Sequence, residues 1–232
     1  MTSFSAQWLP DPLPQDPLQV AETWLRQAFD EQAQPNPDAM TLATVGPGGQ
    51  PSARVVLCKD IVLPEGYLVF FTNYESRKGA ELAQHPRVAA VLHWDALRRS
   101  VRVEGFVVRS PARESDDYFA SRPWQSRVGA WASQQSRPIG TRAALIEQLR
   151  AAGRRLGTPP VGPDSRAADE SLPVSVPRPP HWGGYRLWAE AVELWVEGAY
   201  RLHDRARFTR TLTPAPDGGF TFTPWRSERL QP

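Results

Sequence analysis

Hydrophobic positions along this chain recur mostly with the period of a β-strand, and only a few segments have the period of a helix. Short apolar or alternating runs predict strands over residues 40–45, 52–59, 67–72, 87–94, 100–109, 182–195, 200–210 and 220–230. Pro47-Gly48-Gly49 is expected to join the first two strands as a hairpin turn. Many consecutive short strands with few helices favour an antiparallel barrel over a parallel α/β sheet.

Four segments carry the spacing or the end signals of helices. The first is expected to start at Asp16-Pro17 and to end before Pro35, with one apolar face made of Leu18, Ala21, Leu25, Ala28 and Phe29. Start signals at Ser76, Ser110-Pro111 and Thr141 predict helices over residues 77–84, 111–121 and 142–156. We expect residues 1–15 to be a mobile segment and residues 16–232 a single domain, with a Pro-rich loop at about 157–180.

Length, charge and cysteine content bound the class of protein. The 232 residues are 41% hydrophobic, which suffices for one large domain with a sizeable core. The 27 basic and 25 acidic residues leave a net charge of +2, too balanced for a nucleic-acid-binding surface. A single cysteine excludes an intrachain disulfide, and no zinc-type ligand spacing is present. Without a signal-peptide pattern or a run of transmembrane length, we expect a cytoplasmic protein with no metal and no membrane association.

Three potential cations near the C-terminus are the most informative residues of the chain. Arg201, His203 and Arg205 follow a glycine turn after an apolar run, so the pattern predicts a β-hairpin. On a strand these three side chains would share one face, where they would repel each other, whereas a polyanionic ligand would hold them together. The alternative is a solvated edge strand whose charges discourage aggregation.

Further polar clusters can be interpreted as parts of an anion site. Tyr118 and Arg122 are spaced to share a helix face, and with Ser126 they would suit a phosphate monoester. Arg77 and Lys78 lie in a first helical turn, where cations oppose the helix dipole unless a phosphate binds there. The alternative for that pair is a solvated basic surface.

Some candidates depend on features that the pattern leaves open. Arg54 and Lys59 have opposite parity along their strand, so they share a ligand only if the strand ends or bends near Lys59. Gln135 and Ser136 lie in a polar loop that is more often simply solvated. Trp195 is more often a core residue than a ligand contact. Neither Ser126 nor Ser136 has an obvious His–Asp partner, so the sequence gives no convincing nucleophile.

Taken together, these segments resemble one known family, the pyridoxamine 5′-phosphate oxidases. The resemblance covers about residues 16–232 apart from the linker, and is carried by residues 54–59, 70–79, 118–126, 129–138, 177–186, 201–205 and 228–232. Two of these segments read Tyr-Phe-Ala-Ser-Arg-Pro at 118–123 and Arg-Leu-His-Asp-Arg at 201–205. The ordered set is far more specific than any single segment.

The resemblance implies a mainly β, antiparallel FMN-binding split barrel with peripheral helices (α+β), in a homodimer with FMN at the interface. It assigns to FMN the residues Arg54, Val55, Val56, Leu57, Cys58, Lys59, Phe71, Thr72, Arg77, Lys78, Ser100, Gln135, Ser136, Trp195 and Arg205. It assigns to the substrate phosphate the residues Lys59, Tyr118, Arg122 and Ser126. Arg201 and His203 would flank the substrate's pyridine ring and be the catalytic pair.

The activity implied by the resemblance is FMN-dependent oxidation of phosphorylated B6 vitamers, pyridoxamine and pyridoxine 5′-phosphate, to pyridoxal 5′-phosphate. Oxygen would be the acceptor and hydrogen peroxide a product, with the protein orienting and tuning the cofactor. Ser100 and Trp124 depart from the family's usual glutamine and arginine, which bears on ligand affinity. A phenazine-pathway type of flavin oxidase and a non-catalytic flavin or B6 binder are the alternatives. The preferred vitamer, the rates, the role of the loop and any allosteric product site do not follow from the sequence.

Overall fold

The computed structural model describes residues 8–163, 174–216 and 218–232. The described chain forms two compact units. Of the described residues, the sheet unit contains those within 8–70, 84–108 and 186–232, and the helical unit contains those within 71–83 and 109–185. The predicted mobile segment at 1–15 and the predicted loop at 157–180 lie partly outside the described residues. The single-domain boundary at 16–232 stays a prediction.

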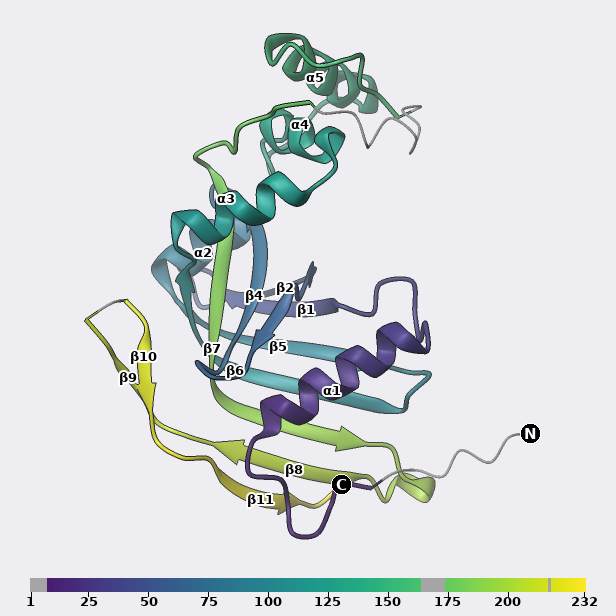
Figure 1. Cartoon of the computed structure of the whole chain (residues 1–232), viewed down its shortest axis with the longest axis vertical. Helices are drawn as coiled ribbons and strands as arrows, with labels where there is room; N and C mark the ends of the chain where they lie inside the picture. Colours follow the sequence, from purple (N-terminus) through teal and green to yellow (C-terminus); the bar gives the residue numbers. More distant parts are fainter. Residues whose placement is uncertain (1–7, 164–173, 217) are drawn as a thin grey trace. The chain divides into compact units, whose positions relative to one another are not determined.

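Among the described residues, the strands form a nine-stranded sheet and a separate two-stranded one. The strands are β1 Ala39–Val45, β2 Pro51–Leu57, β3 Asp60–Val62, β4 Tyr67–Asn73, β5 Arg87–Trp94, β6 Arg99–Arg109, β7 Trp182–Val196, β8 Asp204–Thr209, β9 Leu212–Pro214, β10 Phe220–Phe222 and β11 Arg226–Leu230. The main order is β11-β8-β7-β6-β5-β1-β2, with β4 paired to β3 and β7 (Figure 1). β1 pairs antiparallel with β2 and β5, as β7 does with β8, so the predicted antiparallel, mainly β class is confirmed.

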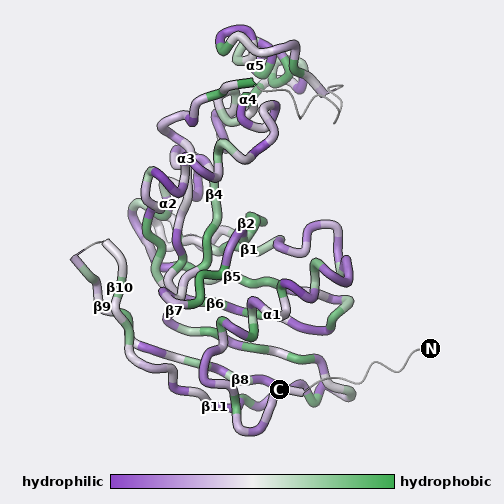
Figure 2. Tube along the Cα trace, in the orientation of Figure 1, coloured by the Kyte–Doolittle hydropathy of each residue, from purple (hydrophilic) through white to green (hydrophobic). Residues whose placement is uncertain are grey.

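The core of the sheet unit follows from the alternation of apolar positions. β5 and β6 bury every second side chain, while β4 is a nearly continuous apolar run, green in Figure 2. Helix α1, Pro17–Asp30, begins where Asp16 caps the Leu18 amide at 2.9 Å, as predicted. Leu18, Ala21, Leu25 and Ala28 of its apolar face are buried, whereas Phe29 is 50% exposed. Burying each large aliphatic side chain of this face contributes about 1.5–3 kcal/mol.

The helical unit contains the remaining helices of the described chain: α2 Arg77–Gln84, α3 Ala112–Ser121, α4 Trp124–Ala132 and α5 Arg142–Arg155. Their core is made of Phe119, Trp124, Val128, Ala152, Val161, Val176 and Trp182. Helix α4 was not predicted, because Pro123 was interpreted only as the stop of the preceding helix. Proline is equally compatible with the start of a helix, where its missing N–H has no partner to lose. Trp124, the first residue of α4, is 1% exposed and anchors that core.

The C-terminal region departs from its predicted strands in two places. The strand predicted at 200–210 begins only at Asp204, because Tyr200 and Arg201 have φ angles of 56° and 65° in a short 3₁₀ turn, Ala199–Arg201. Arg201 and His203 therefore precede the strand, and the prediction that they share a strand face with Arg205 was wrong. The run predicted at 220–230 divides into β10 and β11. No helix among the described residues is long and apolar enough to cross a membrane.

Candidate functional site

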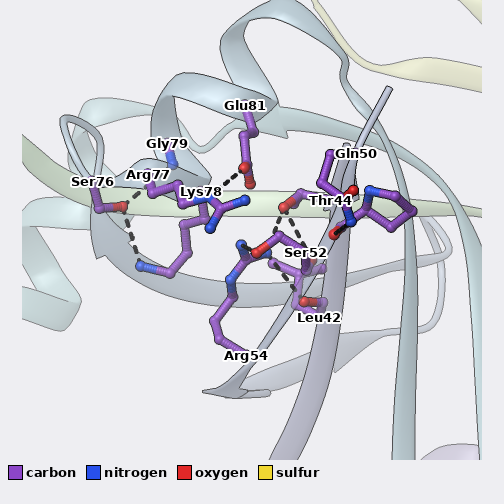
Figure 3. Close-up of polar contacts among 11 residues, drawn as sticks. Leu42, Thr44, Gln50, Ser52, Arg54, Ser76, Arg77, Lys78, Gly79 and Glu81 are labelled. Carbon is purple, nitrogen blue, oxygen red and sulfur yellow. Dashed lines mark hydrogen bonds and ion pairs between the residues drawn. The ribbon is translucent and has the colours of Figure 1, made fainter. Parts of the chain in front are cut away.

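The first turn of α2 gathers several of the predicted FMN residues within the helical unit. Ser76 caps the helix, its Oγ accepting from the Gly79 amide at 3.3 Å. The Lys78 side chain turns back over this turn (Figure 3). Its Nζ donates to Thr72 Oγ1 at 2.8 Å, to Ser76 Oγ at 3.1 Å and to Gln135 Oε1 at 2.7 Å. The structure thus brings Thr72, Lys78 and Gln135 together, although they lie far apart in sequence.

The charges of this turn favour an anionic ligand. Lys78 is only 7% exposed, and the first turn of α2 holds no acidic residue. Arg77 lies on the same turn, where its side chain is 59% exposed and its guanidinium pairs with Glu81 at 2.8 Å (Figure 3). A buried ammonium at a helix N-terminus suits a phosphate, since both the charge and the helix dipole attract it. Ser136 follows Gln135 with a left-handed φ of 73° and is exposed.

Three stacked aromatic rings form a second feature of the helical unit. Phe71 stacks on Tyr118 with ring centroids 3.9 Å apart, and on Trp182 at 5.5 Å. The Arg122 guanidinium lies over the Trp182 ring, 4.8 Å from its centroid. A cation over an aromatic face is attracted by the ring quadrupole. Trp182, which the sequence did not assign a role, therefore links Phe71 and Tyr118 to Arg122.

Arg122 lies just beyond the end of a helix, whereas it was predicted to lie on the helix. Helix α3 ends at Ser121, and Arg122 is its C-cap with extended backbone, ψ 148°. The prediction that Tyr118 and Arg122 share a helix face was therefore wrong in mechanism, although the two side chains still interact electrostatically. Burial lowers the pKa of Arg122, and Tyr118 partly offsets that. Its Nη1 is buried without a hydrogen-bond partner in the described chain.

Ser126, the last member of the predicted phosphate clamp, lies exposed on the first turn of α4. The orphaned Nη1 of Arg122 has strong hydrogen-bonding capacity to offer a ligand, since leaving such a group unpaired in a buried place is costly. A guanidinium can hold a phosphate through two parallel hydrogen bonds. The geometry of the helical unit therefore provides two separate places for a phosphate group, the α2 turn and the surroundings of Arg122.

In the sheet unit, β2 and the residues after it hold the other basic candidates. Arg54 donates to Thr44 Oγ1, to Ser52 Oγ at 2.9 Å and to Leu42 O at 3.3 Å (Figure 3). Arg54 and Lys59 were expected to share a ligand only if their strand ended or bent near Lys59. β2 ends at Leu57, two residues before Lys59, so that condition is met. Lys59 Nζ pairs with Asp38 Oδ2 at 2.5 Å.

The apolar residues of the same segment divide into two sets. Val56 and Cys58 are buried, whereas Val55 is 65% exposed and Leu57 36% exposed. Burial raises the pKa of the Cys58 thiol to about 12. A thiol with such a pKa stays protonated and unreactive near neutrality. Cys58 is therefore a packing residue, and any contact it makes with FMN would come from its backbone.

The hairpin of β7 and β8 positions the C-terminal candidates of the sheet unit. Trp195 and Arg205 are paired across the two strands. The Trp195 ring lies 4.7 Å from the His203 ring. His203 Nδ1 accepts from the Gly198 amide at 3.2 Å, so the neutral imidazole carries its proton on Nε2. His203 is thus oriented as a hydrogen-bond donor through Nε2.

Arg205 is held by the protein itself. Its Nη2 pairs with Glu193 at 2.8 Å and its Nη1 donates to Gln231 O at 2.9 Å. Glu193 is 7% exposed and also pairs with Arg102 at 2.6 Å. Glu193 was not predicted as a site residue, although its position two residues before Trp195 places it on the same strand face. Arg201 is exposed on the left-handed turn, and Ser100 lies opposite His93 in the β5–β6 register.

Comparisons with known proteins agree with these features. The family described as pyridoxamine 5′-phosphate oxidase matches residues 25–151, and the pyridoxine 5′-phosphate oxidase C-terminal dimerisation region matches residues 182–232. The chain is 46% identical to the pyridoxine/pyridoxamine 5′-phosphate oxidase of Burkholderia orbicola, over 94% of this chain and 89% of that one. The enzyme of the same name from Paracoccus denitrificans is 46% identical, over 84% of this chain and 82% of that one.

Two solved structures are similar to the whole chain. PhzG from Burkholderia lata, in complex with tetrahydrophenazine-1-carboxylic acid, matches with a TM-score of 0.76 and 28% identity, over 96% of this chain and 95% of that one. A pyridoxamine 5′-phosphate oxidase-related, FMN-binding protein from Nostoc punctiforme matches with a TM-score of 0.66 and 16% identity, over 95% and 100%. The match to the dimerisation region supports a homodimer. The chain therefore belongs to the pyridoxamine 5′-phosphate oxidase family of oxidoreductases, with the FMN-binding split-barrel fold and FMN as its cofactor.

Proposed function

We propose that this chain oxidises pyridoxine 5′-phosphate and pyridoxamine 5′-phosphate to pyridoxal 5′-phosphate, with oxygen as the acceptor and hydrogen peroxide as a product. The observation that carries the proposal is Arg122, whose buried Nη1 has no hydrogen-bond partner in the described chain while its guanidinium lies over Trp182. A phosphate ester of a flat aromatic ring would satisfy the guanidinium. The relatives of this name, at 46% identity, support the same substrate class.

In this proposal the substrate phosphate is held mainly by Arg122. Tyr118 and Ser126 each add a hydroxyl, and Lys59 adds a further cation. Hydrogen bonds between a charged group and its partner contribute roughly 1.5–3 kcal/mol each, so this set accounts for strong selection of a phosphorylated ligand. Because phosphate binding occurs away from the carbon that reacts, it lowers the entropy cost of orienting that carbon.

The residues of the α2 turn fit the terminal phosphate of FMN. Lys78 is buried, and Thr72, Ser76 and Gln135 fix its Nζ beside the amides of the helix N-terminus. We propose that this turn binds the phosphate. The remaining family-assigned residues keep their proposed contacts with FMN: Arg54, Val55, Val56, Leu57, Cys58, Lys59, Phe71, Arg77, Ser100, Ser136, Trp195 and Arg205. When bound, FMN would supply the redox chemistry of a two-electron oxidation with oxygen as the final acceptor.

Arg201 and His203 are the proposed contacts to the substrate ring. With Nδ1 accepting from Gly198, His203 offers its Nε2–H to an oxygen or nitrogen of the ring or its substituents. The exposed guanidinium of Arg201 can stabilise negative charge on the pyridine ring. Loss of a hydride equivalent from the 4′ carbon, together with a proton from the oxygen or nitrogen attached to it, gives the aldehyde directly from the alcohol. From the amine it gives an imine, which water hydrolyses to the aldehyde and ammonia.

A second candidate substrate is favoured by one observation, the similarity to PhzG along nearly the whole chain. The ligand in that structure is a tricyclic carboxylic acid, which also combines a flat ring system with an anionic group. A carboxylate carries one negative charge and a phosphate monoester nearly two at neutral pH. The charge that the site prefers therefore separates the two candidates.

Steady-state turnover by the FMN-loaded protein tests the proposal. We expect oxidation of pyridoxine 5′-phosphate with stoichiometric hydrogen peroxide, and little turnover of unphosphorylated pyridoxine at the same concentration. Preferred oxidation of a reduced phenazine carboxylic acid would replace the proposed substrate by the second candidate. Binding of flavin and vitamer without any turnover would instead leave a carrier protein.

A further inference from the structure

Arg127 is a second guanidinium near Arg122 that neither the sequence nor the comparisons assign to any ligand. It lies on α4, and its backbone amide donates to Pro123 O at 3.1 Å, one turn back toward Arg122. Its side chain is half-buried, and Nη2 donates to Val174 O at 2.9 Å. Its Nε is buried and has no hydrogen-bond partner in the described chain. Part of this guanidinium therefore has hydrogen-bonding capacity that the described chain does not use.

The pairing of Arg127 with Arg122 is unfavourable without an anion. Burial is the main cause of the lowered pKa of Arg122, and the positive charge of Arg127 lowers it further. Each guanidinium presents a buried nitrogen without a partner in the described chain, Nη1 of Arg122 and Nε of Arg127. Gln125, between them in sequence, has a buried Oε1 without a partner in the described chain, and exchanging its amide oxygen and nitrogen would present the NH₂ group there. A bound anion would satisfy these donors and remove the repulsion between the two cations.

We propose that Arg127 is a specificity-determining residue at the phosphate site of Arg122, and that the two guanidinium groups select a dianionic phosphate over a monoanionic group. This inference rests on the proposed function, since it concerns the same substrate site. The attraction of a second cation grows with the charge of the ligand, so Arg127 favours a phosphate monoester over a sulfate ester of the same shape. The same property would disfavour a carboxylate substrate.

The experiment compares two unreactive ligands that differ mainly in charge, 4-deoxypyridoxine 5′-phosphate and 4-deoxypyridoxine 5′-sulfate. Their dissociation constants are measured by calorimetry on the FMN-loaded protein for the wild type, Arg127→Gln, Arg127→Lys and Arg113→Gln. Arg113 is the matched control, because it lies on α3 of the same unit and its side chain is 93% exposed. Flavin occupancy is measured for every variant, so that damage to the fold is detected separately.

We expect Arg127→Gln to weaken binding of the phosphate ester by about tenfold or more and binding of the sulfate ester much less. Arg127→Lys should keep most of the preference for phosphate, and Arg113→Gln should keep all of it. Equal losses for both ligands in Arg127→Gln would mean that Arg127 acts only through packing and its bond to Val174, which overturns the inference. Unchanged binding of both ligands would overturn it as well.

Failure of the proposed function has a different signature. If the wild type binds both esters yet does not turn over pyridoxine 5′-phosphate, the proposed oxidase activity is wrong, while the charge selectivity of Arg127 is still measured. If the wild type turns over that substrate and Arg127→Gln keeps the full preference for phosphate, the activity stands and the role of Arg127 falls.

Discussion

The buried guanidinium of Arg210 occupies the space that a side chain at residue 66 would need, and residue 66 is a glycine. Arg210 is 7% exposed and donates to Ala189 O and to Gly66 O, both at 2.7 Å. Its guanidinium also lies over Phe222, at 4.0 Å, and over Trp225, at 4.2 Å. Burial lowers its pKa to about 10, so it remains charged at neutral pH. These contacts fix a guanidinium that would otherwise move easily.

We predict that Gly66→Ala destabilises the protein more than a simple change of backbone preference would. A Cβ at Gly66 would lie 2.3 Å from Arg210 Nη2, and the φ of 74° already disfavours alanine. The matched control is Gly49→Ala, with φ 77° and no atom within 4 Å of the added Cβ. Positive φ alone costs roughly 1–2 kcal/mol, and overpacking typically adds 1–3 kcal/mol. Thermal unfolding of both variants checks this, and equal losses would show that Arg210 moves aside freely.

Cys58 makes the free energy of unfolding depend on pH in the alkaline range. Its folded pKa of about 12 lies above that of a thiol in the unfolded chain, because burial disfavours the thiolate. Below the unfolded pKa both states hold the proton, so the thiol contributes no pH dependence. Above it the unfolded state ionises first, and stability falls until the pH passes the folded pKa.

We predict that the wild type loses about 1.4 kcal/mol more unfolding free energy than Cys58→Ala when the pH exceeds the unfolded thiol pKa by one unit. The quantity to compare is the slope of stability with pH, measured by denaturant unfolding between pH 7.5 and 10, because the substitution also changes packing. Parallel slopes for the two proteins would show that the thiol is not shielded as described.

Arg122 is predicted to affect substrate binding without affecting flavin. Arg122→Ala should raise the KM for pyridoxine 5′-phosphate by about tenfold or more, because the hydrogen bonds to a charged phosphate are lost. Flavin occupancy should stay near normal, since Lys78, Thr72 and Gln135 hold the other proposed phosphate place. Kinetics and flavin-to-protein absorbance ratios decide the matter. A variant that loses flavin and keeps its KM would refute the division into two phosphate sites.

At the scale of the element, the caps of α2 and α5 allow a direct comparison. Ser76 accepts from the Gly79 amide at 3.3 Å, and Thr141 accepts from the Ala144 amide at 3.1 Å. Removing either cap should cost about 0.5–2 kcal/mol. Of the two caps, only Ser76 also accepts a hydrogen bond from Lys78 Nζ, at 3.1 Å. Ser76 therefore also supports the proposed binding site for the FMN phosphate.

We therefore predict that Ser76→Ala and Thr141→Ala both lower thermal stability, whereas only Ser76→Ala weakens FMN binding. Stability is measured by thermal unfolding of the FMN-free protein, and affinity by the quenching of FMN fluorescence on titration. If both variants bind FMN as tightly as the wild type, the first turn of α2 does not carry the cofactor phosphate.

The elements that could be predicted from sequence are those whose ends are set by neighbouring residues. Asp16, Ser76 and Thr141 each cap the helix that follows them, so α1, α2 and α5 begin where expected. Pro123 is compatible with the end of one helix and the start of another, and only the burial of Trp124 in the core decides for α4. Local signals therefore place helix starts, while packing decides which ambiguous segments are helical.

The start of β8 could not be predicted because it depends on backbone geometry that the pattern of side chains does not encode. Tyr200 and Arg201 adopt left-handed φ angles, which ordinary side chains rarely favour. The loop closes tightly, since a Cβ at Gly198 would lie 1.8 Å from Leu202 O. A period-two pattern carries no information about such a turn. For the same reason the bond between Arg205 and the buried Glu193, which depends on strand pairing, was absent from the predicted site.

At the scale of the whole molecule, the cofactor links folding to function. A ligand that binds only the folded state stabilises it by mass action, by about 1.4 kcal/mol for each tenfold rise in concentration above its dissociation constant. The match of residues 182–232 to a dimerisation region supports a homodimer as the folded species. The stability of the FMN-free protein is therefore expected to depend on both the flavin and the protein concentration.

We predict that FMN raises the melting temperature of the FMN-free homodimer in a concentration-dependent way, while riboflavin raises it much less at equal concentration. Riboflavin has the same ring system and lacks only the phosphate, so the difference measures the contribution of the phosphate alone. The buried Lys78 at the α2 turn is the physical reason to expect a large difference, since an ammonium there gains a full charge partner from FMN and none from riboflavin. Light scattering on the same samples reports the dimer, and Lys78→Met should bring the two melting curves together. Equal stabilisation by both flavins would show that binding depends on the ring and that the α2 turn has another role.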